Sequence, residues 1–198
     1  QKPLLDCILG LGPDETAPSV RLNAPKTVTE PTAAVSWVGI DNRDPQETLV
    51  YSYRVGGPKA PWSAWTESTA TTLTDLTVGT QNVTVRAKDS AGNIGSATAG
   101  IQFNPSPKAA LSVSDSKVEA GSEVVLNASG SSDPTDDNLS YTWDLDGDGT
   151  FDKSGGDTIR RSFESPGQYE VLVQVSDGKS TDTARVTVTV APPDGQLN

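Results

Sequence analysis

Histidine and methionine are both absent from this 198-residue chain, and there is a single cysteine, Cys7. Without histidine the chain lacks the commonest general base and metal ligand, and it cannot form a Ser–His or Cys–His nucleophile pair. One cysteine excludes an internal disulfide and any cysteine-based zinc site. The sequence therefore predicts a non-catalytic protein.

Long hydrophobic runs and positive charge are also lacking. No apolar run approaches the roughly 20 residues of a membrane-spanning helix, so we expect no membrane span. The chain carries 15 basic and 26 acidic residues, a net charge of −11, which is the opposite of what nucleic-acid binding requires. It begins at Gln1 without a methionine, and we expect a processed product that is secreted or held at the cell surface.

What the sequence does contain is short runs in which apolar and polar residues alternate, the pattern of half-buried β-strands. Turn-forming stretches rich in Gly, Pro, Asp and Ser separate the runs. This predicts an all-β protein of two tandem immunoglobulin-like β-sandwiches, with Trp37 and Trp143 in the two cores. The alternating residues are Val35, Trp37, Tyr51, Tyr53, Val55, Val83, Val85, Ala87, Val124, Leu126, Tyr141, Trp143, Leu145, Tyr169, Val171, Val173, Val175, Val186, Val188 and Val190.

The predicted boundaries follow from proline content and charge. Residues 105–108 include two prolines and form a short, stiff linker. The expected organisation is an apolar N-terminal arm (1–13), a first sandwich (14–104), the linker (105–108), a second sandwich (109–191) and a C-terminal tail (192–198). Residues 107–198 hold 16 acidic and 7 basic residues, whereas residues 1–106 hold 10 and 8, so the negative charge belongs mainly to the second half.

The second half resembles the PKD domain family, an immunoglobulin-like sandwich. The matching stretches are NASGSSDP at 127–134, YTWDL at 141–145 running into DGDG at 146–149, PGQYEV at 166–171 and VSDG at 175–178. The first half is similar to the fibronectin type III and Ig-like modules of bacterial secreted proteins, through DETAP at 14–18, YSYR at 51–54, WSAW at 62–65 and VRAKDSAGN at 85–93. Both resemblances imply spacers, adhesive segments or accessory domains on extracellular proteins.

The densest acidic stretch surrounds the DGDG motif. Eight aspartates and one lysine lie between residues 133 and 157. Calcium takes six to eight oxygen ligands, and the alternation of Asp144, Asp146 and Asp148 followed by a glycine can wrap such ligands around one ion. Thr150 can add its carbonyl and Asp152 a further carboxylate. The family resemblance also implies calcium near this loop.

Two other interpretations of the acidic stretch stay open. It can be a solvated acidic turn, or it can supply a catalytic carboxylate pair; the pair is disfavoured because glycosidase carboxylates face each other across a cleft. If calcium binds, Asp133 and Asp177 are expected to approach it from neighbouring loops.

Two further features suggest partners. Trp62 and Trp65 either cover the edge of their own sandwich or form an aromatic platform for sugar rings. The arm contains Leu4, Leu5, Ile8, Leu9 and Leu11, which is too apolar for a free tail. It either packs on its own domain, donates a strand to a neighbouring copy, or is a remnant of a preceding domain. Cys7 within it is a buried thiol or forms an intermolecular disulfide.

Together these features predict a non-catalytic extracellular structural or adhesive protein. It would be a filament or surface-layer subunit that assembles through its arm with copies of itself or other surface proteins, and calcium would stabilise its PKD loop. The alternative is an accessory polysaccharide- or protein-binding segment of a larger secreted hydrolase.

Overall fold

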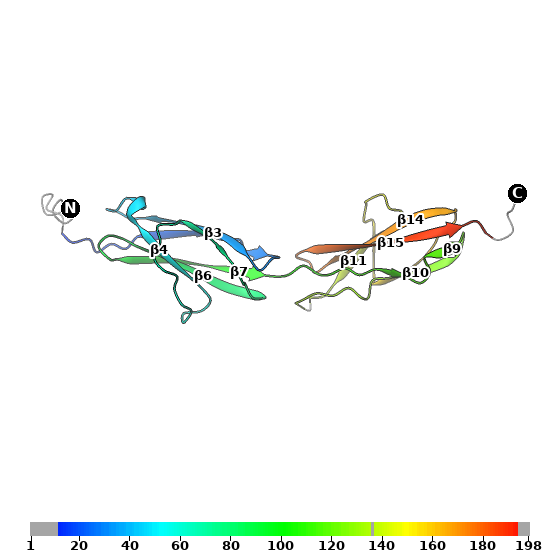
Figure 1. Cartoon of the computed structure of the whole chain (residues 1–198), viewed down its shortest axis with the longest axis horizontal. Coiled ribbons are helices and arrows are strands. Elements are labelled where there is room, and N and C mark those ends of the chain that lie inside the picture. The colour runs from blue at the N-terminus through cyan, green and yellow to red at the C-terminus, as the bar shows by residue number, and fades with distance from the viewer. Residues whose placement is uncertain (1–11, 136, 194–198) are drawn as a thin grey trace. The chain divides into compact units, whose positions relative to one another are not determined.

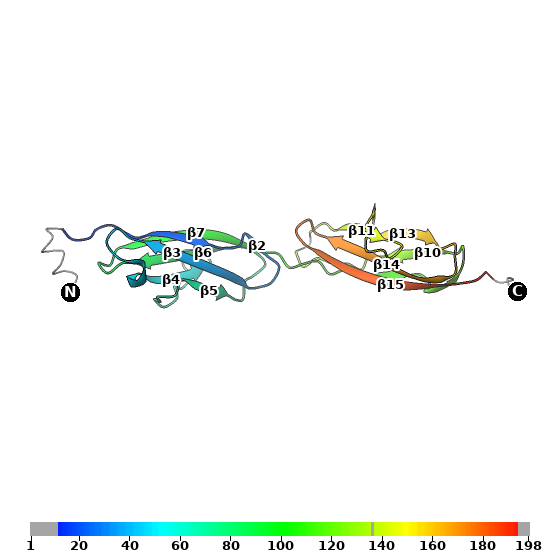
Figure 2. The same cartoon turned by 90° about the horizontal axis from the view of Figure 1, so that it is seen from above.

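The computed structural model describes residues 12–135 and 137–193, and the chain divides into two compact units, Gln1–Asn104 and Pro105–Asn198. Each unit consists of two β-sheets (Figures 1 and 2). The prediction of an all-β protein with tandem immunoglobulin-like sandwiches is confirmed.

The first unit places β1, β3 and β5 in one sheet and β2, β7, β6 and β4 in the other. All pairings are antiparallel except the short parallel contact between β2 and β7. A 3-10 turn at Gln46–Thr48 precedes β4. The strands are β1 (Ser19–Asn23), β2 (Thr27–Val28), β3 (Ala33–Ile40), β4 (Val50–Val55), β5 (Ala70–Leu73), β6 (Gly79–Lys88) and β7 (Ile94–Phe103).

The core of the first unit lies between its sheets, where every second residue of β3 is buried, as is every second residue of β6 from Val83 to Ala87. Trp37 is 4% exposed, and its ring centroid lies 6.2 Å from that of Tyr51, which is fully buried. The Tyr51 hydroxyl accepts a hydrogen bond from the Gly39 amide at 3.1 Å, so the one polar atom of this ring is satisfied inside the core. Trp37 is therefore a core residue, as predicted.

The second unit has a five-stranded sheet in the order β12-β11-β14-β15-β9 and a three-stranded sheet in the order β13-β10-β8. The β15–β9 pairing is parallel and the other pairings are antiparallel. The strands are β8 (Ser112–Val113), β9 (Lys117–Glu119), β10 (Glu123–Asn127), β11 (Ser140–Asp144), β12 (Lys153–Gly155), β13 (Thr158–Ser162), β14 (Gly167–Ser176) and β15 (Thr181–Ala191).

Trp143 forms the centre of the second core and is completely buried among valines of β14 and β15. Its indole nitrogen donates a hydrogen bond to the Gly156 carbonyl at 3.2 Å, beyond the end of β12. The same strand that buries Trp143 ends one residue later at Asp144, so the core fixes where the acidic loop begins.

The predicted arm residues Leu4, Leu5, Ile8, Leu9 and Leu11, together with Cys7, lie outside the described residues. Within the described parts of the chain, no helix is long and apolar enough to cross a membrane.

Candidate functional sites

The acidic loop begins inside the second core. Asp144, the last residue of β11, has a fully buried side chain, whereas Asp146 and Asp148 are exposed. Gly147 and Gly149 have φ angles of 75° and 87°, which side-chain-bearing residues rarely adopt. Alternation of aspartates with such glycines folds the loop back over the end of its own strand.

Asp144 organises this loop by accepting hydrogen bonds from its backbone. Its Oδ1 accepts from the amides of Asp146 and Gly147 at 3.3 and 2.7 Å, and its Oδ2 accepts from Gly149 at 2.9 Å. Burial by itself would raise the pKa of this carboxyl, but the three amide hydrogen bonds outweigh burial and the pKa is lowered. Asp144 therefore stays ionised and acts as a cap for the turn.

Three of the predicted ligands come together. Asp144, Asp146 and Asp148 each offer a carboxylate oxygen, and these oxygens lie within 4.8 Å of one another. Asp148 Oδ1 also accepts from the Thr150 amide at 2.7 Å, so Thr150 lies in the same turn. Carboxylate oxygens are the ligands that calcium prefers, and this donor set fits such an ion.

Asp152 does not belong to this group of three. It lines a surface hollow with Leu145, Asp146, Lys153 and Arg161. The hollow therefore combines the Asp152 carboxylate with two basic side chains. Asp146 and Asp148 therefore form the exposed side of the candidate metal site.

The expectation that Asp133 and Asp177 approach the acidic loop is wrong. In the β11–β14 register Ser140 pairs with Ser176, while Asp144 pairs with Leu172. Asp177 therefore follows β14 at the far end of β11 from Asp144, five residues beyond Leu172 and roughly 16 Å away along the strand at about 3.3 Å per residue. Asp133 lies in the segment that leads into β11, at the same far end.

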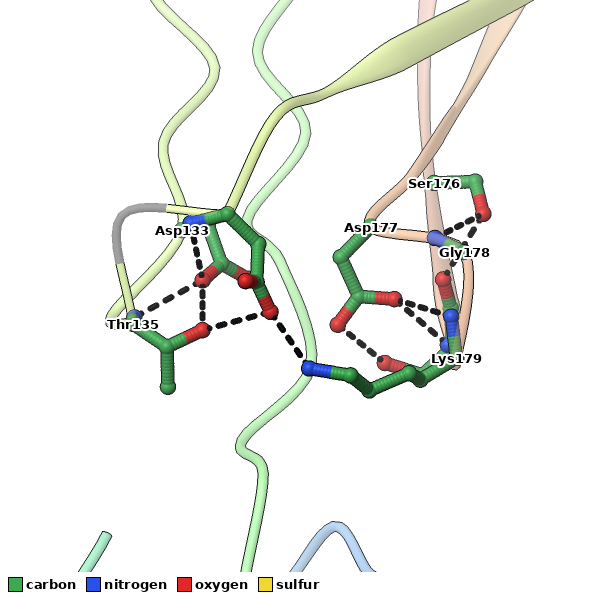
Figure 3. Close-up of polar contacts among 8 residues, drawn as sticks. Asp133, Thr135, Ser176, Asp177, Gly178 and Lys179 are labelled. Atoms are coloured by element: carbon green, nitrogen blue, oxygen red, sulfur yellow. Dashed lines mark hydrogen bonds and ion pairs between the residues drawn. The ribbon is translucent and has the colours of Figure 1, made fainter. Parts of the chain in front are cut away.

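These two aspartates order their own turns instead (Figure 3). Asp177 Oδ1 accepts from the amides of Lys179 and Ser180 at 2.7 and 2.6 Å, and Asp133 Oδ1 accepts from the Thr135 amide at 2.7 Å. The Lys179 ammonium donates to Asp137 Oδ2 at 2.7 Å; this hydrogen bond is the main reason why the pKa of Asp137 is lowered and that of Lys179 raised.

Trp62 and Trp65 lie beside cations. The Arg54 guanidinium carbon is 4.5 Å from the Trp62 ring centroid, and that of Arg86 is 4.0 Å from Trp62 and 4.5 Å from Trp65. The Lys88 ammonium is 4.4 Å from the Trp65 centroid. We call Arg54, Trp62, Arg86, Trp65 and Lys88 the cation–π ladder. Both tryptophans are half-buried, so this arrangement favours packing on their own sheet over an open sugar platform.

The basic members of the ladder were not predicted from the sequence. Arg54 lies on β4, Arg86 and Lys88 lie on β6, and these strands pair with Arg54 opposite Thr84. Arg86 and Lys88 are two residues apart and so share one face of β6. The two-residue spacing of Arg86 and Lys88 indicates a shared face, but their contact with Trp62 and Trp65, more than twenty residues earlier, has no local sequence signal.

The sequence profile of the PKD domain family matches residues 104–191. The second unit is a PKD domain. The match contains the whole acidic loop and the strands that hold it. No curated protein matches the chain.

Solved structures similar to the chain include fibronectin type III and Ig-like modules. Extracellular domains 3–5 of Drosophila OTK are 13% identical with a TM-score of 0.56, over 86% of this chain and 62% of that one. Fibronectin(III)-like modules of Clostridium thermocellum CbhA are 16% identical with a TM-score of 0.45, over 90% and 97%.

A carbohydrate-binding module structure from the β-sandwich superfamily is 33% identical with a TM-score of 0.42, over 46% of this chain and 37% of that one. The chain thus spans 37% and 62% of the carbohydrate-binding module and OTK structures, respectively. The OTK similarity supports the β-sandwich fold of the chain.

Proposed function

We propose that this chain is a non-catalytic extracellular module with a structural or adhesive role. The observation that carries the proposal is the combination of a PKD domain at 104–191 with a second β-sandwich in the same chain. Modules of these two types serve on extracellular proteins as spacers, adhesive segments or accessory domains. A net charge of −11 is compatible with contacts to proteins or cations and unsuited to nucleic acid.

The finer role that we propose is assembly with other copies through the apolar segment 1–13. Its five leucine and isoleucine residues are the sequence feature that supports this role, because an apolar segment can add a strand to an exposed sheet edge. Repeated head to tail, such a contact produces a fibre.

Assembly is tested by sedimentation velocity and negative-stain microscopy of the full chain. The expected result is filaments or oligomers that disappear when residues 1–12 are deleted. The matched control deletes residues 194–198 and should assemble normally. A monomeric full chain at high micromolar concentration, or assembly that survives deletion of residues 1–12, would refute the filament role.

We also propose that calcium stabilises the PKD loop through Asp144, Asp146 and Asp148. Three carboxylates that offer oxygens within 4.8 Å of one another repel unless a cation lies among them. An ion that binds only the folded loop raises the melting temperature of the domain. Calorimetry in excess calcium and in excess chelator measures this shift.

The variant for this test is Asp148→Asn, and its control is Glu164→Gln, which removes one charge from an exposed position of the same domain. Asp148→Asn should lose most of the calcium-dependent shift, whereas Glu164→Gln should keep it. Identical melting curves of the wild-type PKD domain with calcium and with chelator would exclude the calcium role.

The second candidate function is an accessory segment of a larger secreted hydrolase that holds polysaccharide or protein through Trp62 and Trp65. The observation in its favour is that both tryptophans keep part of their surface exposed, although the cations stacked on the two rings favour packing on their own sheet. A glycan array with the full chain tests it: binding should be lost in Trp62→Ala and Trp65→Ala and kept in Arg21→Gln. A blank array removes this candidate.

A further inference from the structure

Three acidic residues from distant parts of the sequence meet at one end of the first unit. Asp14 precedes β1, Asp41 directly follows β3, and Asp89 directly follows β6. Strand β1 starts opposite the end of β3, because Ser19 pairs with Ile40. Each of the three carboxylates offers an oxygen, and these oxygens lie within 4.8 Å of one another.

No described basic side chain neutralises these three carboxylates. Within residues 12–135 and 137–193, Asp14, Asp41 and Asp89 form no ion pair. The nearby Arg43 guanidinium instead donates to the Gly12 carbonyl at 2.7 Å. The arrangement therefore concentrates negative charge without a counter-charge from the described residues.

A second, independent observation concerns the hydrogen bonding of two of these carboxylates. Asp14 Oδ1 accepts from the Thr16 amide at 3.1 Å, and Asp41 Oδ1 accepts from the Arg43 and Asp44 amides at 2.9 and 2.8 Å. The Oδ2 atoms of Asp14 and Asp41 are both completely buried and have no hydrogen-bond partner. A buried carboxylate oxygen without a partner is costly and needs an explanation such as an ion or a water.

The third carboxylate is held rigidly in place. Asp89 is 4% exposed, and its Oδ1 accepts from the amides of Gly92 and Asn93 at 2.6 and 2.8 Å. The Asn93 side-chain amide donates both to Asp89 Oδ2 at 2.8 Å and to the Asp14 carbonyl at 2.9 Å. Asn93 thus ties the segment that carries Asp14 to the turn that carries Asp89.

The segment before β1 also approaches β7 so closely that only glycine fits. A Cβ atom on Gly95 would lie 1.7 Å from the Pro18 carbonyl oxygen. Gly95 therefore allows the chain from Asp14 to Pro18 to lie against the start of β7. This close contact, together with the Asn93 hydrogen bonds, holds the Asp14 carboxylate in a fixed position beside those of Asp41 and Asp89.

We propose that Asp14, Asp41 and Asp89 bind a calcium ion that clamps the segment entering the first unit to the ends of β3 and β6. Three carboxylates that offer oxygens within 4.8 Å of one another match the preference of calcium for oxygen ligands. Magnesium is disfavoured because it dehydrates reluctantly and requires near-ideal octahedral geometry. This site is separate from the PKD loop and does not depend on the proposed function.

The test is a calcium titration of the full chain, ¹⁵N-labelled and followed by NMR, up to about 10 mM, since extracellular calcium modules bind at about 10⁻⁴–10⁻³ M. The backbone amides of Thr16, Asp44 and Asn93 report on the new site, and those of Gly147 and Gly149 report on the PKD loop. We expect the first group to shift and saturate. The two sites can therefore succeed or fail separately.

The matched variants are Asp14→Asn/Asp41→Asn and Asp148→Asn. The double variant should weaken calcium binding at Thr16, Asp44 and Asn93 at least tenfold, whereas Asp148→Asn should leave these shifts unchanged. Magnesium at the same concentration should shift them less than calcium. Absence of shifts in the wild type, or equal shifts in the double variant, would overturn the site and leave a buried water or a shared proton as the partner of the two oxygens.

The melting temperatures of the wild type and of the double variant, measured in chelator and in calcium, give a second test. In excess chelator, the double variant should melt at the same temperature as the wild type or higher, because it removes repulsion between carboxylates. In calcium, only the wild-type first unit should gain stability. If the double variant does not fold, the wild-type titration decides alone.

Discussion

The guanidinium carbon of Arg86 lies 4.0 Å from the centroid of the Trp62 ring. It also lies 4.5 Å from that of Trp65, so one cation is shared between both tryptophans of the Trp-x-x-Trp motif. The Nε atom of Arg86 is buried without a hydrogen-bond partner, as is that of Arg54. Contact with the aromatic rings compensates for burying part of both guanidinium groups, and Arg54 in addition donates from Nη1 to the Pro58 carbonyl at 2.7 Å.

Replacing Arg86 should destabilise the first unit. Arg86→Gln removes two cation–π contacts, each of about 0.5–1 kcal/mol at a partly exposed site. We expect a loss of about 1–2 kcal/mol, which lowers the melting temperature of a domain of this size by about 4–8 °C per kcal/mol. Calorimetry measures the shift. Arg21→Gln, at an exposed position of β1, removes the same charge and should have little effect.

Removing the charge of Asp144 should destabilise the PKD domain. Asp144 accepts from Gly147 through Oδ1 at 2.7 Å and from Gly149 through Oδ2 at 2.9 Å, so Asp144→Asn keeps one acceptor oxygen and turns an amide group toward the backbone donor of the other. A buried donor left without a partner costs about 1–3 kcal/mol. Urea unfolding of the full chain in excess chelator, where calcium cannot contribute, measures the loss. Asp146→Asn, exposed in the same loop, is the control, and an equal loss in both variants would show that Asp144 is not a special cap.

Acid should weaken the PKD domain through the same residue. The pKa of Asp144 is lowered in the folded state because the amide hydrogen bonds outweigh burial. A lowered folded pKa gives stability that is complete above the unfolded pKa of about 3.9 and is lost as the pH falls through the folded value. The free energy of unfolding of the domain should therefore drop below about pH 4. Asp144→Asn should reduce this pH dependence, and an unchanged slope would contradict the assignment.

The strands and the two cores were predictable from local pattern. Trp37 and Trp143 each lie in an alternating run, and burial of alternate residues follows directly from the two-residue period of a strand. The turn after β11 was also visible, because glycines in the sequence DGDG allow the positive φ angles that the loop adopts at Gly147 and Gly149.

Contacts between distant segments were not predictable. Asp14, Asp41 and Asp89 each occurred in a recognisable turn or family stretch, but their convergence depends on the β1–β3 pairing and on the loop that follows β6. Asp177 shows the converse: it was expected near Asp144, yet the β11–β14 register sends it to the far end of the sheet. The composition shows only that carboxylates are abundant. Which of them lie close together depends on the register of the paired strands, and local sequence does not give that register.

Comparing alanine substitutions at the two glycines of the acidic loop distinguishes the cost of backbone strain from the cost of a steric clash. Gly147 and Gly149 have similar positive φ angles of 75° and 87°. A Cβ atom on Gly147 would lie 2.9 Å from the Glu170 carbonyl oxygen, a backbone atom of β14, whereas a Cβ on Gly149 meets nothing within 4 Å. Both alanine variants should incur the left-handed strain, on the order of 1 kcal/mol.

Only Gly147→Ala should add the cost of displacing the loop from β14, for which overpacking gives about 1–3 kcal/mol. Urea unfolding of Gly147→Ala and Gly149→Ala side by side measures the difference directly. Amide exchange at Gly149, whose hydrogen bond to Asp144 closes the turn, should accelerate more in Gly147→Ala, because a displaced loop loses that bond. Equal destabilisation by the two substitutions would mean that the loop does not rest on Glu170, and the PKD loop would then be positioned by Asp144 alone.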